Sequence, residues 1–150
     1  MITAHHLVFG RKYTQPIPTD YILAYNFNGN ILDSSGNGRD ATANGTITYG
    51  VGRKGLAGTA IQFGSGNIMT PILPISSILS VSFWLKTNST SVTNIIAELS
   101  SNFNGKQAFL IDMNDTATIL GKIMAGISSA GYHNLKYTND IINDGTWKHI

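Results

Sequence analysis

Glycoside hydrolysis in this chain would have to come from its acidic side chains, because it usually needs two carboxylates about 5–10 Å apart. Alternate residues of a strand face the same side, so two carboxylates on one strand would stand at even spacing. The single glutamate, Glu98, has no acidic neighbour at such spacing, and Asp112 and Asp115 are three residues apart. No motif resembles a nucleophile elbow either. We therefore expect no catalytic residues in this segment and no enzymatic activity.

A second chemistry is metal binding, and the turn-rich stretch around Asp33 offers oxygen ligands for it. Calcium prefers carboxylate, amide and carbonyl oxygens, and Asp33, Asn37 and Asp40 would supply them. The other interpretation is a structural turn, in which Asp33 accepts hydrogen bonds from the amides of Ser35 and Gly36 and Asn37 takes a left-handed conformation. Because the stretch lacks the alternating acids of an EF-hand, we favour the turn. We expect no required cofactor and keep a structural calcium ion as the alternative.

Carbohydrate binding is the third chemistry, because sugars stack on aromatic rings while polar side chains bond their hydroxyls. Trp84 falls on the polar face of an alternating strand, with Lys86 beside it on the same face. Tyr132 and His133, in the predicted loop SSAGYHN, are further candidate contacts. The alternative is that Trp84 is half-buried under a loop or under the N-terminal residues, since tryptophans are usually largely buried.

The composition narrows the class of protein that could position these residues. The chain has 150 residues, of which 42% are hydrophobic and 12% charged, with a net charge of +2 and no cysteine. That length suits one domain, and the absence of cysteine excludes disulfides and cysteine zinc sites. No run of Lys or Arg could follow a phosphate backbone, and no apolar stretch reaches roughly 18 residues. We expect neither nucleic-acid binding nor membrane insertion.

Hydrophobic residues recur with a period of two, which is typical of half-buried strands. In the clearest strand, residues 78–87, one face carries Leu79, Val81, Phe83 and Leu85. Clusters of Gly, Asn and Ser separate such segments, and no helical period appears, so we predict an all-β, antiparallel two-sheet sandwich. The other predicted strands are residues 21–27, 46–50, 59–64, 93–100, 107–113, 117–127, 133–138 and a strand starting at 146. Residues 1–20 show no clear period and contain Pro16 and Pro18, so we predict an N-terminal arm or anchoring segment before the domain of residues 21–150.

Four motifs occur in a recognisable order. They are AYNFNGNILDSSGNGRDATANGT (24–46), GLAGTAIQFGSGN (55–67), SVSFWLKT (80–87) and NDGTWKHI (143–150). Together they resemble the laminin G-like jelly-roll domains of the concanavalin A-like superfamily, over roughly residues 21–150. The resemblance implies a two-sheet jelly roll and includes relatives that hold calcium or hydrolyse glycosides. In that family further strands follow the last motif, so we expect this domain to be truncated at its C-terminus, or completed by a partner chain.

The resemblance implies that the protein functions outside the cell, whereas its first residues lack the basic and apolar regions of a signal peptide. A virion protein reconciles the two, because it is made in the host cytoplasm and displayed after lysis. We therefore expect a phage tail, fibre or decoration protein, located on a virion or outside cells. It would adhere to host-surface carbohydrate or bind other virion subunits, in an oligomeric assembly. The alternatives are a bacterial extracellular carbohydrate-binding module of a larger protein, and a glycoside hydrolase whose catalytic residues lie outside this segment.

Overall fold

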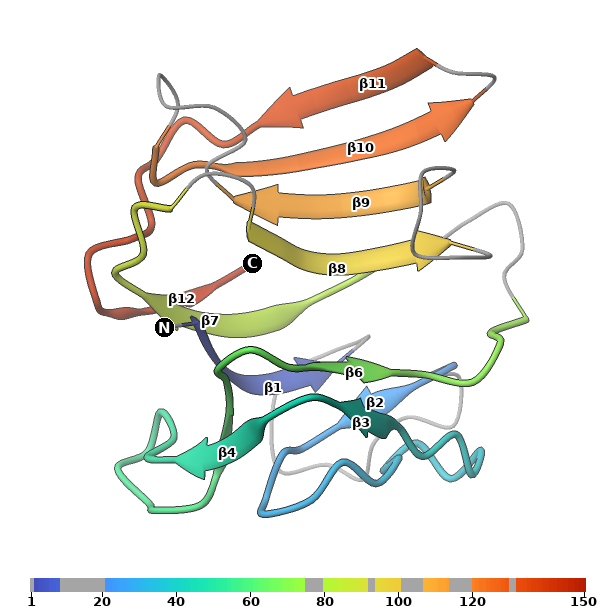
Figure 1. Ribbon diagram of the computed structural model, residues 1–150, viewed down its shortest axis with the longest axis vertical. Coiled ribbons are helices and arrows are strands. Elements are labelled where there is room, and N and C mark those ends of the chain that lie inside the picture. The colour runs from blue at the N-terminus through green and yellow to red at the C-terminus, as the bar shows by residue number, and fades with distance from the viewer. Residues whose placement is uncertain are drawn as a thin grey trace. The chain divides into compact units, whose positions relative to one another are not determined.

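The computed structural model describes residues 2–8, 21–74, 80–91, 94–100, 107–113, 120–129 and 132–150, and those ranges contain strands and no helix (Figure 1). All strand pairs are antiparallel. The predicted all-β class is therefore confirmed. The chain forms two compact units, Met1–Thr87 with Trp147–Ile150, and Asn88–Thr146.

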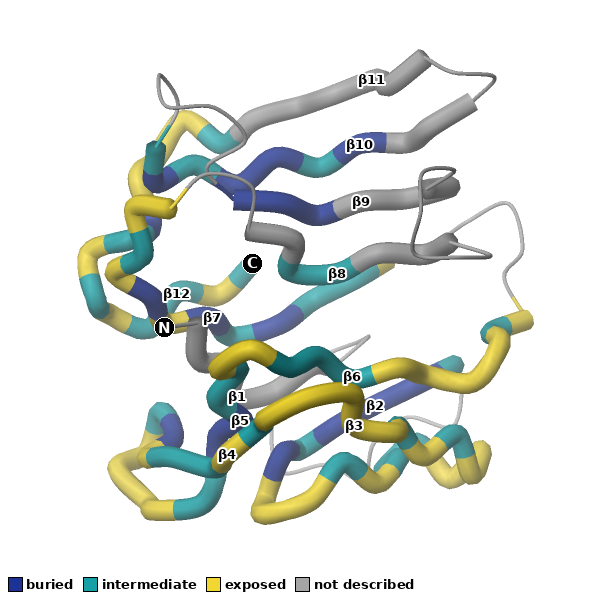
Figure 2. The backbone as a smooth tube through the Cα atoms, viewed as in Figure 1, coloured by how far each residue is buried: buried dark blue, intermediate teal, exposed yellow. Residues whose placement is uncertain are grey.

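The first unit is built on a six-stranded sheet in the order β12-β7-β1-β5-β4, with β2 paired to β1. These strands are β12 (Trp147–His149), β7 (Phe83–Thr87), β1 (Ile2–Val8), β5 (Ala60–Phe63), β4 (Ile47–Gly50) and β2 (Ala24–Tyr25). A separate ribbon pairs β3 (Thr42–Asn44) with β6 (Asn67–Met69). β3 arises in a stretch predicted only as turns, and it is exposed along its length (Figure 2).

β1 is a regular strand within the segment of residues 1–20 that was predicted to be an N-terminal arm or anchoring segment. It lies between β7 on one side and β5 and β2 on the other. Its register with β7 shifts between Ala4 and His6. A bulge of this kind inserts an extra residue and interrupts the two-residue period, which explains why the sequence pattern is not visible. The prolines that suggested an arm, Pro16 and Pro18, lie outside the described residues.

The core of the first unit forms around alternate residues of the segment before the Asn-Gly turn. Leu23, Tyr25 and Phe27 are buried and form one cluster with Ile61 of β5. The predicted strand of residues 21–27 is reduced to the two residues of β2. Phe27 has a φ of 53° and is not extended. The partly buried hydrophobic residues packed against this cluster are Ile31, Ala41, Ile47, Tyr49, Phe63, Ile68 and Leu73.

β7 has the two different faces that the alternation predicted. Phe83, Leu85 and Thr87 are buried, whereas Trp84 is half-buried and Lys86 is exposed. The strand is shorter than predicted, since it begins at Phe83. Residues 75–79 lie outside the described part of the chain. Reciprocal backbone hydrogen bonds between Phe83 and Ile150, of 3.1 and 2.9 Å, extend its pairing with β12.

The second unit is a four-stranded antiparallel sheet in the order β11-β10-β9-β8 (Figure 1). Its strands are β8 (Asn94–Ser100), β9 (Gln107–Met113), β10 (Ile123–Ser129) and β11 (Tyr132–Tyr137). They agree with the predicted strands within a few residues, apart from a later start of β10. The buried side chains described in this unit are Ile111, Asp112, Met113, Ile123, Met124 and Ile142. Residues 101–106 and 114–119 lie outside the described part of the chain.

Candidate functional site

The turn around Asp33 is the first candidate site, and its carboxylate accepts four hydrogen bonds from the chain. Oδ1 accepts from the amides of Ser35 (2.9 Å) and Ala24 (3.1 Å). Oδ2 accepts from the Ser35 hydroxyl (2.8 Å) and the Arg39 amide (3.0 Å). The predicted bond from Ser35 is confirmed, while the other amides come from Arg39 and Ala24. Asp33 thereby ties its own turn to β2.

The same hydrogen bonds bear on whether the oxygens of this turn are available to bind a calcium ion. A carboxylate offers about four lone-pair directions, and Asp33 uses them for the donors above. Asn37 directs its amide nitrogen, a donor, at the carbonyl oxygen of Tyr21 (2.7 Å). Asp40 Oδ1 accepts from the Asp33 amide (2.8 Å). The three predicted ligands do share one turn, in which the carboxylate of Asp33 already serves as an acceptor for the chain. Among the described residues no group of three or more His, Asp or Glu could hold a metal, and the structural calcium ion stays a prediction.

One detail of the predicted turn is wrong. The left-handed residues are Gly36 (φ 87°) and Gly38 (φ 67°), while Asn37 between them has an ordinary φ. Glycine adopts positive φ without a steric penalty, so Gly36 and Gly38 provide the left-handed conformations with which the chain turns. Asn37 keeps the conformation from which its amide nitrogen reaches the Tyr21 carbonyl.

A buried tyrosine anchors the far end of the turn. The Tyr25 hydroxyl donates to the carbonyl of Arg39 at 2.7 Å, and Arg39 donates through Nη1 to the carbonyl of Ile22 at 2.7 Å. Burial, with smaller effects from the charges of Asp33 and Asp40, raises the pKa of the Tyr25 hydroxyl. It therefore remains a neutral donor. The hydrogen bonds of Asp33, Tyr25 and Arg39 therefore fasten the turn to the core segment of residues 22–25.

The hydrogen bonds to the Asp33 carboxylate determine how the stability of the protein should depend on pH. Partial burial alone would raise the pKa of Asp33, but hydrogen bonds from Ser35, Arg39 and Ala24 outweigh it and lower the pKa below its ordinary value. A lowered folded-state pKa gives stability that is present above the unfolded value of about 3.9 and lost as pH falls through the folded value. We expect Asp33→Asn to be less stable than the wild type at pH 7, with the difference shrinking below pH 4. Urea unfolding of both proteins across that range checks this, and a difference independent of pH would contradict it.

The second candidate site is the outer face of β7 and β12, which we call the Trp84 face. It comprises Ser82, Trp84, Lys86, Trp147 and His149, together with Arg53. Trp84 is paired in register with His149, and Lys86 with Trp147. The Trp84 and His149 ring centroids are 4.9 Å apart with the rings tilted by 38°. His149 Nε2 lies 2.8 Å from Ser82 Oγ, which fixes the imidazole beside the indole.

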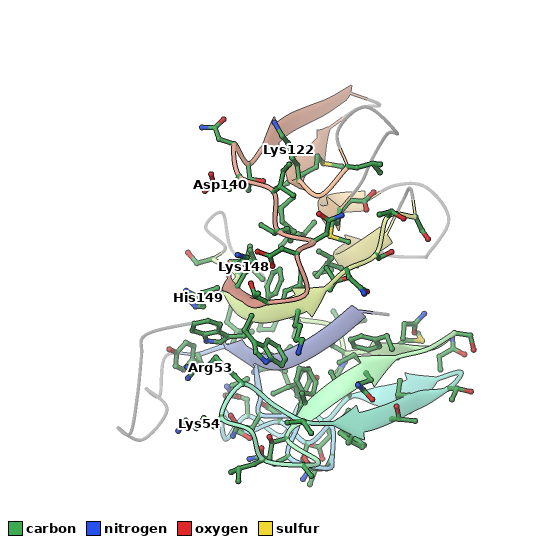
Figure 3. All side chains as sticks on the ribbon, turned by 90° about the vertical axis from the view of Figure 1, so that its left-hand side faces the viewer. Arg53, Lys54, Lys122, Asp140, Lys148 and His149 are labelled. Atoms are coloured by element: carbon green, nitrogen blue, oxygen red, sulfur yellow. The ribbon has the colours of Figure 1, made fainter. Side chains whose placement is uncertain are left out.

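Arg53 reaches this face from the turn between β4 and β5. Its guanidinium carbon lies 4.3 Å from the centroid of the Trp84 ring, the geometry of a cation–π contact. The turn is closed by the Gly52 amide donating to the Leu56 carbonyl (2.9 Å) and the Gly55 amide to the Gly52 carbonyl (3.0 Å). Figure 3 shows Arg53 next to His149, with Lys54 farther along the same turn. One face of β7 therefore packs into the core, and the other carries the side chains of the Trp84 face.

Trp84 is thus half-buried with a loop residue over its ring, which was the alternative to an open sugar platform. Sequence reasoning missed Arg53 and His149, which come from two segments that lie far from Trp84 in the sequence. Ser82 was already placed on the face of Trp84, because it lies two residues before it in the same predicted strand. The available signal was the Gly-rich stretch GVGRKG, whose glycines allow a tight turn that presents its cations.

The other predicted contacts differ from expectation. Tyr132 and His133 begin β11 instead of lying in a loop, and their side chains are outside the described part. They belong to the second unit, whereas Trp84 and Lys86 belong to the first. β11 starts earlier than the sequence suggested because Tyr132 and His133 pair with Ser129 and Ser128 of β10.

Of the acidic residues considered for catalysis, the structure describes the side chain of Asp112. Asp112 in β9 is 2% exposed, and its Oδ1 accepts from the Met113 amide at 2.5 Å. Glu98 lies in β8, but its side chain is not among those described, and Asp115 is also outside them.

No helix in the described ranges could serve as a transmembrane span. Comparison with protein-family models, with curated proteins and with solved structures finds no match to this chain.

Proposed function

We propose that this chain is a non-catalytic binding module that adheres to cell-surface glycans through the Trp84 face. The observation that carries the proposal is the contact of Arg53 and His149 with one half-buried indole. Aromatic and arginine side chains are the groups most enriched at energetically important contacts. Here they are held by a sheet and a closed turn, so binding costs little reordering.

The cluster also suggests how a sugar would be held. Arg53 lies over the Trp84 ring, so a sugar contacts the stacked pair and not a bare indole. Lys86 is exposed on the same face, opposite Trp147, and can donate to hydroxyl groups at its rim. The two-sheet jelly roll and an extracellular setting, both implied by the resemblance to laminin G-like domains, belong to this proposal. The antiparallel strands of both units support the fold.

The test is a glycan array probed with the full chain and with Trp84→Ala. We expect the wild type to bind a subset of glycans and Trp84→Ala to bind them at least about tenfold more weakly, because the ring supplies contact area and supports Arg53. Leu32→Ala is the control, since it truncates an exposed apolar side chain that is not a member of the Trp84 face. Thermal unfolding of each variant verifies folding. The proposal fails if the wild type retains no glycan, or if folded Trp84→Ala binds as well as the wild type.

A further inference from the structure

We infer that the group recognised at the Trp84 face is acidic, a sugar carboxylate bound by the guanidinium of Arg53. This inference rests on the proposed function, because the carboxylate must be presented on a glycan. It goes further by naming the class of sugar and the residue that selects it.

The first observation is that the chain leaves a buried donor of Arg53 without a hydrogen-bond partner. Its Nε is buried without a hydrogen-bond partner. The one interaction described for its side chain is the contact of the guanidinium with the Trp84 ring. The face of an aromatic ring attracts the positive charge, but it is not a hydrogen-bond acceptor for the in-plane N–H donors. This contact holds the guanidinium over the indole, and its terminal N–H groups form the fixed fork of a planar guanidinium. Such a fork matches the two oxygens of a carboxylate.

The second observation is the charge of the surroundings. The acidic residues between 21 and 87 are Asp33 and Asp40, and both are engaged in the Asp33 turn. The Trp84 face itself carries the cations of Arg53 and Lys86, with no acidic side chain among its members. A concentration of one sign of charge attracts ligands of the other sign. Neutral sugars would leave this charge and the Arg53 fork unused.

The experiment compares a uronic-acid oligosaccharide with its neutral glucose counterpart and with a sulfated one, by direct titration of the full chain. We expect the wild type to prefer the uronic-acid ligand over the neutral one by at least about tenfold, the size of one charge-assisted bidentate contact. Arg53→Gln should abolish that preference. Arg53→Lys should restore only part of it, because an ammonium keeps the charge without the fork.

Lys54→Gln is the matched control, because it removes an equal charge from the neighbouring, exposed position of the same turn. It should keep the preference for the uronic-acid ligand. Loss of the preference in Lys54→Gln as large as in Arg53→Gln would overturn the role of Arg53 in favour of unspecific attraction. Tighter binding of the sulfated ligand than of the carboxylate would overturn the choice of anion. Equal binding of acidic and neutral sugars would overturn the inference while leaving the proposed function intact, whereas binding of no sugar overturns both.

Discussion

Phe27→Ala should lower the free energy of unfolding by about 3–5 kcal/mol, the usual result of truncating a buried phenylalanine. Phe27 is 2% exposed, and its ring centroid lies 5.8 Å from that of Tyr25 in the main core cluster. Removing the ring leaves a cavity among Leu23, Tyr25 and Ile61, which belong to the same cluster. Chemical denaturation of the two proteins measures the difference.

The backbone at Phe27 makes a sharper prediction. Its φ of 53° lies in the left-handed region, which is unfavourable by about 1–2 kcal/mol for residues with a Cβ. The burial of the ring offsets this strain. Phe27→Gly should therefore be more stable than Phe27→Ala by about 1 kcal/mol, because glycine adopts positive φ without strain.

Leu23 supplies the control for this comparison. It is 1% exposed in the same cluster and is not among the residues with positive φ. At such a position glycine should be less stable than alanine, because it loses more conformational freedom on folding. The order of the Ala and Gly variants should thus reverse between positions 27 and 23. The same order at both positions would show that Phe27 is not strained.

Asp33→Ala should be the most destabilising change among the polar side chains, lowering the free energy of unfolding by about 2–4 kcal/mol. It removes the acceptor for the amides of Ala24, Ser35 and Arg39 at once. Donors left without partners cost about 1–3 kcal/mol each when buried and less where water can reach them. Asp33→Asn should fall between the alanine variant and the wild type, since it keeps one acceptor oxygen.

Asp144 provides the matched comparison for Asp33. Its Oδ1 accepts from the Thr146 amide (2.9 Å) and hydroxyl (2.6 Å), which makes a local turn of similar form, but the residue is exposed. We expect Asp144→Ala to lower the stability by less than about 1 kcal/mol, because water replaces the lost acceptor. Urea denaturation of both alanine variants decides the matter. Equal effects would show that Asp33 is no more than a local turn former.

The parts of the fold that were predictable are those whose physics is local. The alternation in residues 78–87 predicted that Phe83 and Leu85 face the core and that Trp84 does not, because strand geometry fixes the side of each residue. The Asp33 turn was predictable for the same reason, since an Asp followed by small residues bonds the amides next to it.

The remaining features depend on pairing between distant segments. β1 was missed because the register shift after Ala4 hides its period. Arg53 and His149 meet at Trp84 only through the β4–β5 turn and the pairing of β12 with β7. Neither contact has a signature in the residues near Trp84, so the composition of the Trp84 face could not be read from any one motif.

The most direct test of the Trp84 face is an NMR titration that follows the indole N–H signals of the two tryptophans, Trp84 and Trp147, which both lie on it. Trp84→Phe and Trp147→Phe would assign the two signals. On titration with a glycan that the full chain binds, we predict that the Trp84 indole signal shifts progressively and saturates, together with the backbone amides of residues 52–54. A bound glycan that leaves the Trp84 signal unmoved, and instead shifts the amides of the Asp33 turn or of β11, would contradict the proposed binding surface.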